Sequence, residues 1–377
     1  MKIHPYDVSY LTNDSIQEGV GSSQITPLLL GLVKRGLRVS LLSFEKISPS
    51  VELKDFLTNH NVDWYAHPFG RLGPLGGIER FNLIRRDAPA SLIYHARSDL
   101  PAAAVSQKHS ETPILWDVRS LWSDQRSIID SQGWNPIASR GARLLENLAA
   151  KNATGLNTLT YAVVPILEKR HRQLPQHRSV IPTCVDLDRF RVTPLPRGPI
   201  TCLLSGTFNN YYDLEKTRDF ISFLRTKMDL RVVWARGHES TRNMLGVGED
   251  ISVISSYSEM PSLVAQSHFG IAICKDTHLE SLAAAVPTKI AEFLASGRPM
   301  VISKGIGDLD YLFSDGDIGV VIDSAKDFPS ATNRLMNLLN DVNTSEKCNL
   351  AARENFDLNK AIDQYVSLYG KLFKKPC

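Results

Sequence analysis

The fold of this chain is decided by residues 286–303, which read VPTKIAEFLASGRPMVIS. Pro287 suits the first turn of a helix, and Gly297 followed by Pro299 suits its end. Ile290, Phe293 and Leu294 recur at helical spacing and predict a buried apolar stripe. The apolar run at 300–302 is typical of a buried strand. The stretch therefore predicts a short helix that leads into a strand of an α/β sheet.

The polar side chains of this helix predict a ligand. Thr288, Lys289 and Glu292 fall on a different face from the apolar stripe. A hydroxyl and an ammonium at a helix N-terminus favour phosphate, because the helix dipole adds positive potential there. A carboxylate one turn further on suits the vicinal hydroxyls of a ribose. We interpret the helix as a nucleotide-diphosphate site; the alternative is an ordinary α/β unit in which Lys289 and Glu292 are merely solvated.

The first half of the chain opens with a strand, a glycine-rich loop, a helix and a second strand, over residues 7–44. The loop reads GVGSSQ at 19–24, and its glycines let backbone N–H groups approach a ligand closely. It is not a dinucleotide-binding fingerprint, because the third glycine and the acidic residue that should follow are not in place. The pattern predicts the first unit of a doubly wound parallel sheet.

Two further apolar runs, 91–94 and 113–116, read as parallel strands followed by polar side chains. His95 and Arg97 follow the first run, and Asp117 and Arg119 follow the second. Ligands of open α/β sheets bind at the carboxyl ends of strands, so these four residues are site candidates by position. The alternative is structural, an Asp that caps a helix and an Arg paired with it.

The second half repeats the rhythm after a segment rich in proline and glycine at 191–199. Strands are expected at 200–205, 231–235, 252–254, 270–274 and 319–322, and a helix at 214–228. We expect an N-terminal domain at 1–195, a second domain at 196–355, and a C-terminal helix within 356–377 that packs back on the first domain. A cleft between two such halves is the default ligand site.

Composition limits the classes of protein. A length of 377 residues exceeds a single-core domain, and a net charge of +3 is too small to indicate nucleic acid as a partner. Five widely spaced cysteines indicate free thiols in a reducing compartment, and no apolar run is long enough to span a membrane. We expect a cytoplasmic protein. Basic clusters in the first half indicate a solvated face or, alternatively, peripheral contact with the inner face of the membrane.

Four stretches, in this order and spacing, make the chain resemble a known family over nearly all of its length: residues 21–24 with the helix and strand that follow, residues 181–186 with Phe190, residues 206–208, and residues 287–299. They are similar to the GT-B retaining glycosyltransferases of family 4, also called group 1 glycosyl transferases. The resemblance implies an α/β fold of two Rossmann-like doubly wound domains that face a central cleft.

The same resemblance implies a metal-independent hexosyltransferase without a cofactor. Its substrates would be a nucleotide-sugar donor and a glycan or lipid-linked acceptor, in the synthesis of cell-surface polysaccharide or glycoconjugate. Donor binding would fall to Glu292 at the ribose, to Thr288, Lys289, Gly21 and Ser22 at the diphosphate, and to Gly206 and Thr207 beside them. On the acceptor side it implies His95 and Arg97, and we assign catalysis to Asp117 and Arg119, since Asp117 lies near the position of a histidine common in the family.

Two departures from the family pattern keep other functions open. The first carboxylate of the family's Glu-x7-Glu pair would fall at position 284, which is Ala284. A basic pair expected after the Gly206 turn is also missing, with Lys216 as a displaced substitute. The alternatives are an inactive relative that binds a nucleotide sugar, or a sugar-nucleotide epimerase of the same fold. Donor base, sugar, acceptor, linkage and oligomeric state do not follow from the sequence.

Overall fold

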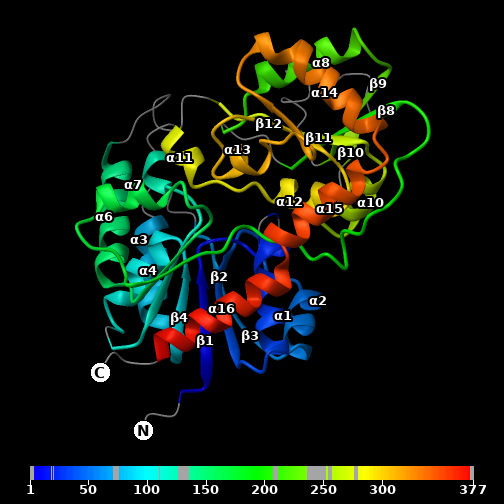
Figure 1. The fold of residues 1–377 in the computed structure, drawn as a ribbon. Coiled ribbons are helices and arrows are strands. Elements are labelled where there is room, and N and C mark those ends of the chain that lie inside the picture. Colours follow the sequence, from blue (N-terminus) through cyan, green and yellow to red (C-terminus); the bar gives the residue numbers. More distant parts are fainter. Residues whose placement is uncertain are drawn as a thin grey trace. The chain divides into compact units, whose positions relative to one another are not determined.

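The computed structural model describes residues 4–17, 19, 21–70, 76–109, 111–125, 136–206, 211–235, 252–253, 257–275 and 279–373. The chain forms two compact units (Figure 1). Unit 1 comprises Met1–Ile181 and Asn359–Cys377, and unit 2 comprises Pro182–Leu358. The expected boundary lay after residue 195, in the proline-rich segment, whereas the contacts place this segment with unit 2.

Unit 1 is built on a seven-stranded parallel sheet in the order β3-β2-β1-β4-β5-β6-β7. Strand order reverses between β1 and β4, which makes their carboxyl ends the topological switch point of the sheet. The strands are β1 (Tyr6–Thr12), β2 (Val39–Glu45), β3 (Val62–Pro68), β4 (Ser91–Arg97), β5 (Ile114–Val118), β6 (Gly155–Thr158) and β7 (His177–Val180).

Strands β1, β2, β4 and β5 are buried almost throughout, as expected for a parallel sheet covered by helices on both faces. The helices of unit 1 are η1 (Gly21–Ile25, a π-helix), α1 (Thr26–Lys34), α2 (Val51–Asn59), α3 (Gly76–Asp87), α4 (Asp99–Ser106), α6 (Pro136–Asn152), α7 (Val164–Arg170) and α16 (Leu358–Phe373). The predicted strand–loop–helix–strand opening is confirmed, and Gly36 ends its helical segment with φ +85°.

Strands β4 and β5 extend further than the apolar runs predicted. β4 includes His95 and Arg97, and β5 includes Asp117, so these side chains lie on the strands rather than in the loops after them. The apolar runs predicted strand ends that lie too early in the sequence, because a buried strand can carry polar side chains whose hydrogen-bond partners come from elsewhere in the fold.

The C-terminal helix α16 packs on unit 1, where Figure 1 shows it lying across the sheet. Its close approach to α1 depends on Gly31, because a Cβ at that position would overlap the Cδ1 atom of Ile362. On the same helix Leu372 lies against Gly155 of β6. Six residues of α16 are buried, at the i, i+3 and i+4 spacing of an amphipathic helix: Ala361, Ile362, Tyr365, Leu368, Tyr369 and Leu372.

Unit 2 contains a six-stranded parallel sheet in the order β10-β9-β8-β11-β12-β13, with its switch point between β8 and β11. The strands are β8 (Ile200–Ser205), β9 (Leu230–Ala235), β10 (Ser252–Val253), β11 (Phe269–Ala272), β12 (Met300–Ser303) and β13 (Gly319–Ile322). The helices are α8 (Leu214–Arg225), η3 (Tyr257–Glu259), α10 (Met260–Ala265), α11 (Leu279–Ala283), α12 (Thr288–Ala295), α13 (Leu309–Leu312), η5 (Ala325–Asp327), α14 (Phe328–Asn340) and α15 (Thr344–Asn355).

The helix and strand predicted from residues 286–303 are α12 and β12. The apolar stripe of Ile290, Phe293 and Leu294 is fully buried, and each such side chain contributes about 1.5–3 kcal/mol relative to exposure. Gly297 follows the helix with φ +77°, as its C′ role requires. Pro287 is the N-cap residue, with ψ 127°, and so precedes the first turn in which it was expected.

The buried Arg298 ties the proline-rich segment to the sheet of unit 2. Its guanidinium donates to the carbonyl oxygens of Thr193, Pro194, Ala265, Ser267 and Ser296 and to the hydroxyl of Thr193. Burial lowers the pKa of Arg298 to about 10. This bonding explains in physical terms why the segment belongs to unit 2 rather than forming a free linker.

Candidate functional site

In unit 1 the candidate site lies at the switch point of the sheet. Gln24 comes from the helical turn that follows β1, Arg97 is the last residue of β4, and Arg119 follows β5. β1 and β4 are paired, with Thr12 opposite Arg97, and β4 and β5 are paired, with Arg97 opposite Asp117. The parallel register therefore brings residues from three distant parts of the sequence to one edge.

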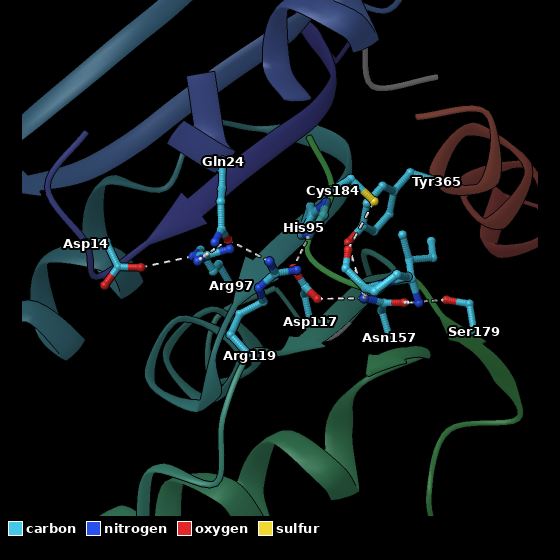
Figure 2. Close-up of polar contacts among 12 residues, drawn as sticks. Asp14, Gln24, His95, Arg97, Asp117, Arg119, Asn157, Ser179, Cys184 and Tyr365 are labelled. Carbon is cyan, nitrogen blue, oxygen red and sulfur yellow. Dashed lines mark hydrogen bonds and ion pairs between the residues drawn. The ribbon is translucent and has the colours of Figure 1, made fainter. Parts of the chain in front are cut away.

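The two guanidinium groups converge on a single oxygen atom (Figure 2). Arg97 donates to Gln24 Oε1 at 3.0 Å, and Arg119 donates to the same atom at 2.7 Å. Arg97 also donates to Asp14 Oδ2 at 2.9 Å, from a side chain that is only 5% exposed. Arg119 reaches Asp117 Oδ2 at 3.5 Å, the limit of a hydrogen bond.

Beneath these arginines lies a buried polar network centred on Asp117. Its Oδ1 accepts from Asn157 at 2.8 Å, and its Oδ2 lies 3.2 Å from His95 Nε2. His95 Nδ1 lies 2.6 Å from the hydroxyl of Tyr369, and Asn157 also donates to Tyr365, so helix α16 supplies two members of the network. His95 and Asp117 are both fully buried.

Electrostatics assign the protons of this network. Burial lowers the pKa of His95, so the imidazole is neutral. Burial alone would raise the pKa of Asp117, but the charge of Arg119 and the hydrogen bond from His95 hold it well below its usual range. An ionised Asp117 accepts a hydrogen bond from His95 Nε2–H, which leaves Nδ1 to accept a hydrogen bond from the Tyr369 hydroxyl.

The glycine-rich loop is held in place by a buried carboxylate at the end of β2. Glu45 Oε1 accepts from Ile16 N and Ser43 Oγ, and Glu45 Oε2 accepts from Ser15 Oγ and Gln17 Nε2. Gly21 packs directly on this segment, since a Cβ on it would overlap the carbonyl oxygen of Ser15. In the same turn the hydroxyl of Ser22 donates to the carbonyl of Gly19.

Backbone strain marks the end of β4. Ser98, directly after Arg97, has φ +79° and ψ 176°, a region that only glycine adopts readily. Such a conformation costs about 1–3 kcal/mol. It is held by a hydrogen bond from Ser98 N to the carbonyl of Asp117. On either side of it, Arg97 turns toward Gln24, and Asp99 turns inward to accept from Trp116.

In unit 2 the candidate site also lies at the switch point of the sheet. Gly206 follows β8 with φ +84°, a conformation that favours glycine, and it lies near Lys289, since a Cβ on it would stand 4.0 Å from Lys289 Cε, an ordinary contact distance. The Lys289 ammonium lies over the ring of Tyr212, 4.2 Å from its centroid. Tyr212 bridges to Cys274, just beyond β11, so the segment after β8, the end of β11 and the first turn of α12 meet at one edge.

Lys289 and Glu292 are both more than nine-tenths buried, which corrects the alternative of two solvated charges. Burial lowers the pKa of Lys289 to about 8 and raises the pKa of Glu292 to about 7, and the attraction between the two groups only partly offsets this. Two ionisable groups in one turn of helix whose pKa values are both shifted toward neutral pH are typical of a functional site. Thr288, half-buried, opens the same turn.

The structure thus brings together Gly206, Lys289 and Glu292 in unit 2, and His95, Arg97, Asp117 and Arg119 in unit 1. Thr207 lies outside the described residues. At position 284 the Ala284 side chain is buried, and the nearby Ser281 hydroxyl is bonded to the hydroxyl of Tyr211, while Glu280 is exposed. Lys216 donates to the carbonyl of Asp323.

Several residues of these sites escaped the sequence analysis. No motif in the sequence marks these residues, and their hydrogen-bond partners come together only in the fold: they are Asp14, Glu45, Asn157, Tyr365 and Tyr369. A polar residue inside an otherwise apolar strand, such as Asn157 in β6, was the one available signal.

Among the described residues, no group of three or more histidine, cysteine or acidic side chains is arranged to hold a metal ion. The four cysteines within the described ranges, Cys184, Cys202, Cys274 and Cys348, carry free thiols. None of the helices in the described part of the chain is both long and apolar enough to cross a membrane.

The architecture, two parallel α/β sheets with flanking helices, is that of the GT-B fold. Among solved structures the chain is similar to sucrose-phosphate synthase from Thermosynechococcus elongatus, with a TM-score of 0.71, 13% identity, and coverage of 97% of this chain and 99% of that one. It is also similar to HepE from Anabaena in complex with UDP-glucose, with a TM-score of 0.70, 12% identity, and coverage of 97% and 100%.

A glycosyltransferase from Rickettsia africae is similar over 99% of this chain and 100% of that chain, with a TM-score of 0.68 and 14% identity. No protein-family model matches the sequence, and no curated protein sequence matches it. At these identities the comparisons establish the fold that the chain shares with these enzymes.

Proposed function

We propose that this protein is a glycosyltransferase that moves a sugar from a nucleotide-diphosphate donor to a glycan or lipid-linked acceptor. One observation carries the proposal: Lys289 and Glu292 lie buried in the first turns of α12, beside the Gly206 turn, at the switch point where α/β sheets bind ligands. HepE, which has the same fold, forms complexes with UDP-glucose and with UDP, and this supports a nucleotide-sugar donor for the present chain.

In this proposal unit 2 binds the donor. The Glu292 carboxylate accepts hydrogen bonds from the ribose hydroxyls, as a partly buried carboxylate does well. The Lys289 ammonium, Thr288 and the backbone of Gly206 face the diphosphate. A positive charge at this place stabilises the leaving diphosphate as the bond to the sugar breaks.

Unit 1 binds the acceptor in this proposal. Arg97 and Arg119 keep 5% and 11% of their side-chain surface exposed, and we assign them contact with the substrate. Asp117 and His95 are fully buried, so we assign them a positioning role in which they orient Arg119. Transfer then depends on alignment of acceptor and donor around an oxocarbenium-like state, with retention of configuration and without a metal ion.

The reaction class and its setting are further parts of the proposal. We place the enzyme among the family 4 hexosyltransferases, in the cytoplasm, with peripheral contact to the inner face of the membrane and a role in cell-surface polysaccharide or glycoconjugate synthesis. The free thiols of the described cysteines and the basic clusters of the first half support this setting.

The test is donor binding and turnover by the purified full chain. Calorimetry with UDP, GDP and TDP identifies the base, and release of nucleotide from the matching sugars, with membrane extract as acceptor, reports transfer. Glu292→Gln should weaken nucleotide binding about tenfold or more, the effect of losing a charged hydrogen-bond acceptor. Glu215→Gln, on the exposed face of α8, is the matched control. Unchanged affinity in Glu292→Gln would remove this residue from the site.

A second function is favoured by one observation, the buried methyl group of Ala284 where related enzymes carry a carboxylate. Under this alternative the protein binds a nucleotide sugar without transferring it. Tight binding of a nucleotide sugar together with no turnover, with any acceptor extract, would support the binding protein over the enzyme.

A further inference from the structure

We infer that the edge of the sheet at the switch point of unit 1 binds a phosphate group, so that the acceptor of the proposed reaction is a phosphorylated molecule. The inference depends on the proposed function only where it calls this ligand the acceptor. The cradle consists of Arg97, Arg119 and Gln24, and it is distinct from the Lys289 and Glu292 pair of unit 2.

The first observation is the sharing of one neutral oxygen by two cations. Arg97 and Arg119 both donate to Gln24 Oε1, so their positive charges are drawn together around an atom that bears no full negative charge (Figure 2). Like charges at such a separation repel, most strongly where burial reduces the screening by water. An anion beside Gln24 converts this repulsion into two charge-assisted hydrogen bonds.

The second observation is that each nearby carboxylate makes only one contact with an arginine. Asp117 lies 3.5 Å from Arg119 and is already bonded to Asn157 and His95. Asp14 makes one bond to Arg97 and is 47% exposed, so a ligand can displace it at little cost. The Arg119 Nε–H is buried and has no hydrogen-bond partner among the described residues, a state that costs about 1–3 kcal/mol.

The third observation is the position. The cradle stands at the carboxyl ends of β4 and β5 beside the turn after β1, where strand order reverses and ligands of open α/β sheets bind. Ser98, whose backbone is strained, directly follows Arg97, and backbone strain of this kind is concentrated at ligand-binding and active sites. The two guanidinium groups together offer more N–H donors than the two oxygens of a carboxylate ligand can use. A phosphate monoester has three terminal oxygens and therefore matches these donors better.

The experiment is calorimetric titration of the full chain with methyl phosphate, with and without saturating UDP. Methyl phosphate should bind in both cases. Arg119→Gln should weaken this binding about tenfold or more, the effect of one charge-assisted hydrogen bond. The matched control is Arg38→Gln, since Arg38 pairs with Asp7 at the opposite, amino end of β1. Methyl phosphate affinity that is the same in Arg119→Gln as in the unaltered chain would overturn the inference.

A second variant guards against simple loss of folding. Gln24→Glu places a carboxylate between the two guanidiniums, so it should abolish binding of methyl phosphate and raise the melting temperature of the ligand-free protein. A Gln24→Glu variant that binds methyl phosphate as before would also overturn the inference. Acetate in place of methyl phosphate should bind more weakly; equal or tighter binding of acetate would exclude phosphate as the preferred group.

The source of the phosphate is resolved by two probes. Binding of the chain to phosphatidylcholine vesicles that contain phosphatidic acid, if lost in Arg119→Gln, indicates a lipid phosphate, whereas binding of methyl phosphate alone indicates a soluble phosphomonoester. Glu292→Gln should leave methyl phosphate affinity unchanged. If UDP fails to bind while methyl phosphate binding still depends on Arg119, the proposed function fails and the phosphate site stands.

Discussion

Glu292 should make the protein less stable, and its replacement by glutamine should stabilise the fold. The carboxyl group is 5% exposed, and burial raises its pKa from 4.5 to about 7 even with the attraction of Lys289 included. At about 1.4 kcal/mol per pKa unit, the ionised group therefore costs about 3 kcal/mol in the folded state. Because this balance already contains the ion-pair attraction, burial and not pairing decides the sign.

The pH dependence follows from the direction of the shift. Below pH 4.5 the carboxyl group is protonated in the folded and unfolded chains alike, and it contributes nothing. Between 4.5 and about 7 the unfolded chain is ionised while the folded chain keeps its proton, so stability falls as pH rises. Above about 7 the full cost is present. The gain in Glu292→Gln should thus be under about 1 kcal/mol at pH 5 and about 3 kcal/mol at pH 8.

The assay is hydrogen exchange of the amides in α12 and β12, which reports the opening of unit 2 alone, together with urea unfolding at both pH values. Glu215→Gln, exposed on α8, should show no gain at either pH. Slower exchange in Glu292→Gln at pH 8, combined with weaker nucleotide binding, would identify a side chain kept for function at the expense of stability. Faster exchange at pH 8 would refute the reasoning and make Glu292 the structural partner of Lys289.

Three further predictions concern unit 1. Ser98→Gly should stabilise the protein by about 1 kcal/mol, because glycine adopts φ +79° without strain; urea midpoints check this, and Ser98→Ala should show no gain. Gly31→Ala should destabilise the protein by about 1–3 kcal/mol, because the new methyl group overlaps Ile362. Adding Ile362→Val, which removes the overlapping Cδ1, should recover part of this loss. Equal losses of stability in Gly31→Ala and in the double variant would contradict the packing. Glu45→Gln should lower the free energy of unfolding by about 2 kcal/mol, because an amide would replace a carboxylate that accepts from four hydrogen-bond donors. Hydrogen exchange at the Ile16 amide should become faster in this variant. Unchanged exchange there would show that Glu45 does not hold the loop.

Helix α12 was predictable because its signals are local. Pro287, Gly297 and the spacing of Ile290, Phe293 and Leu294 each act within one or two turns, and α12 and β12 appear at those positions. Periodicity likewise predicted most of the strands and the C-terminal helix. What it could not predict was the burial of Lys289 and Glu292, because Lys289 packs on the ring of Tyr212, about 80 residues away in the sequence.

The cluster at the switch point of unit 1 shows the division most clearly. The sequence by itself determined that His95, Arg97, Asp117 and Arg119 stand near the ends of two parallel strands, because an apolar run followed by polar residues has a local signature. Only the tertiary structure decided that His95 and Asp117 are fully buried, whereas Arg97 and Arg119 keep 5% and 11% of their side-chain surface exposed. That choice depends on sheet register and on α16, whose Tyr365 and Tyr369 come from more than 200 residues away, and burial with its effect on charge is a property of the packed fold.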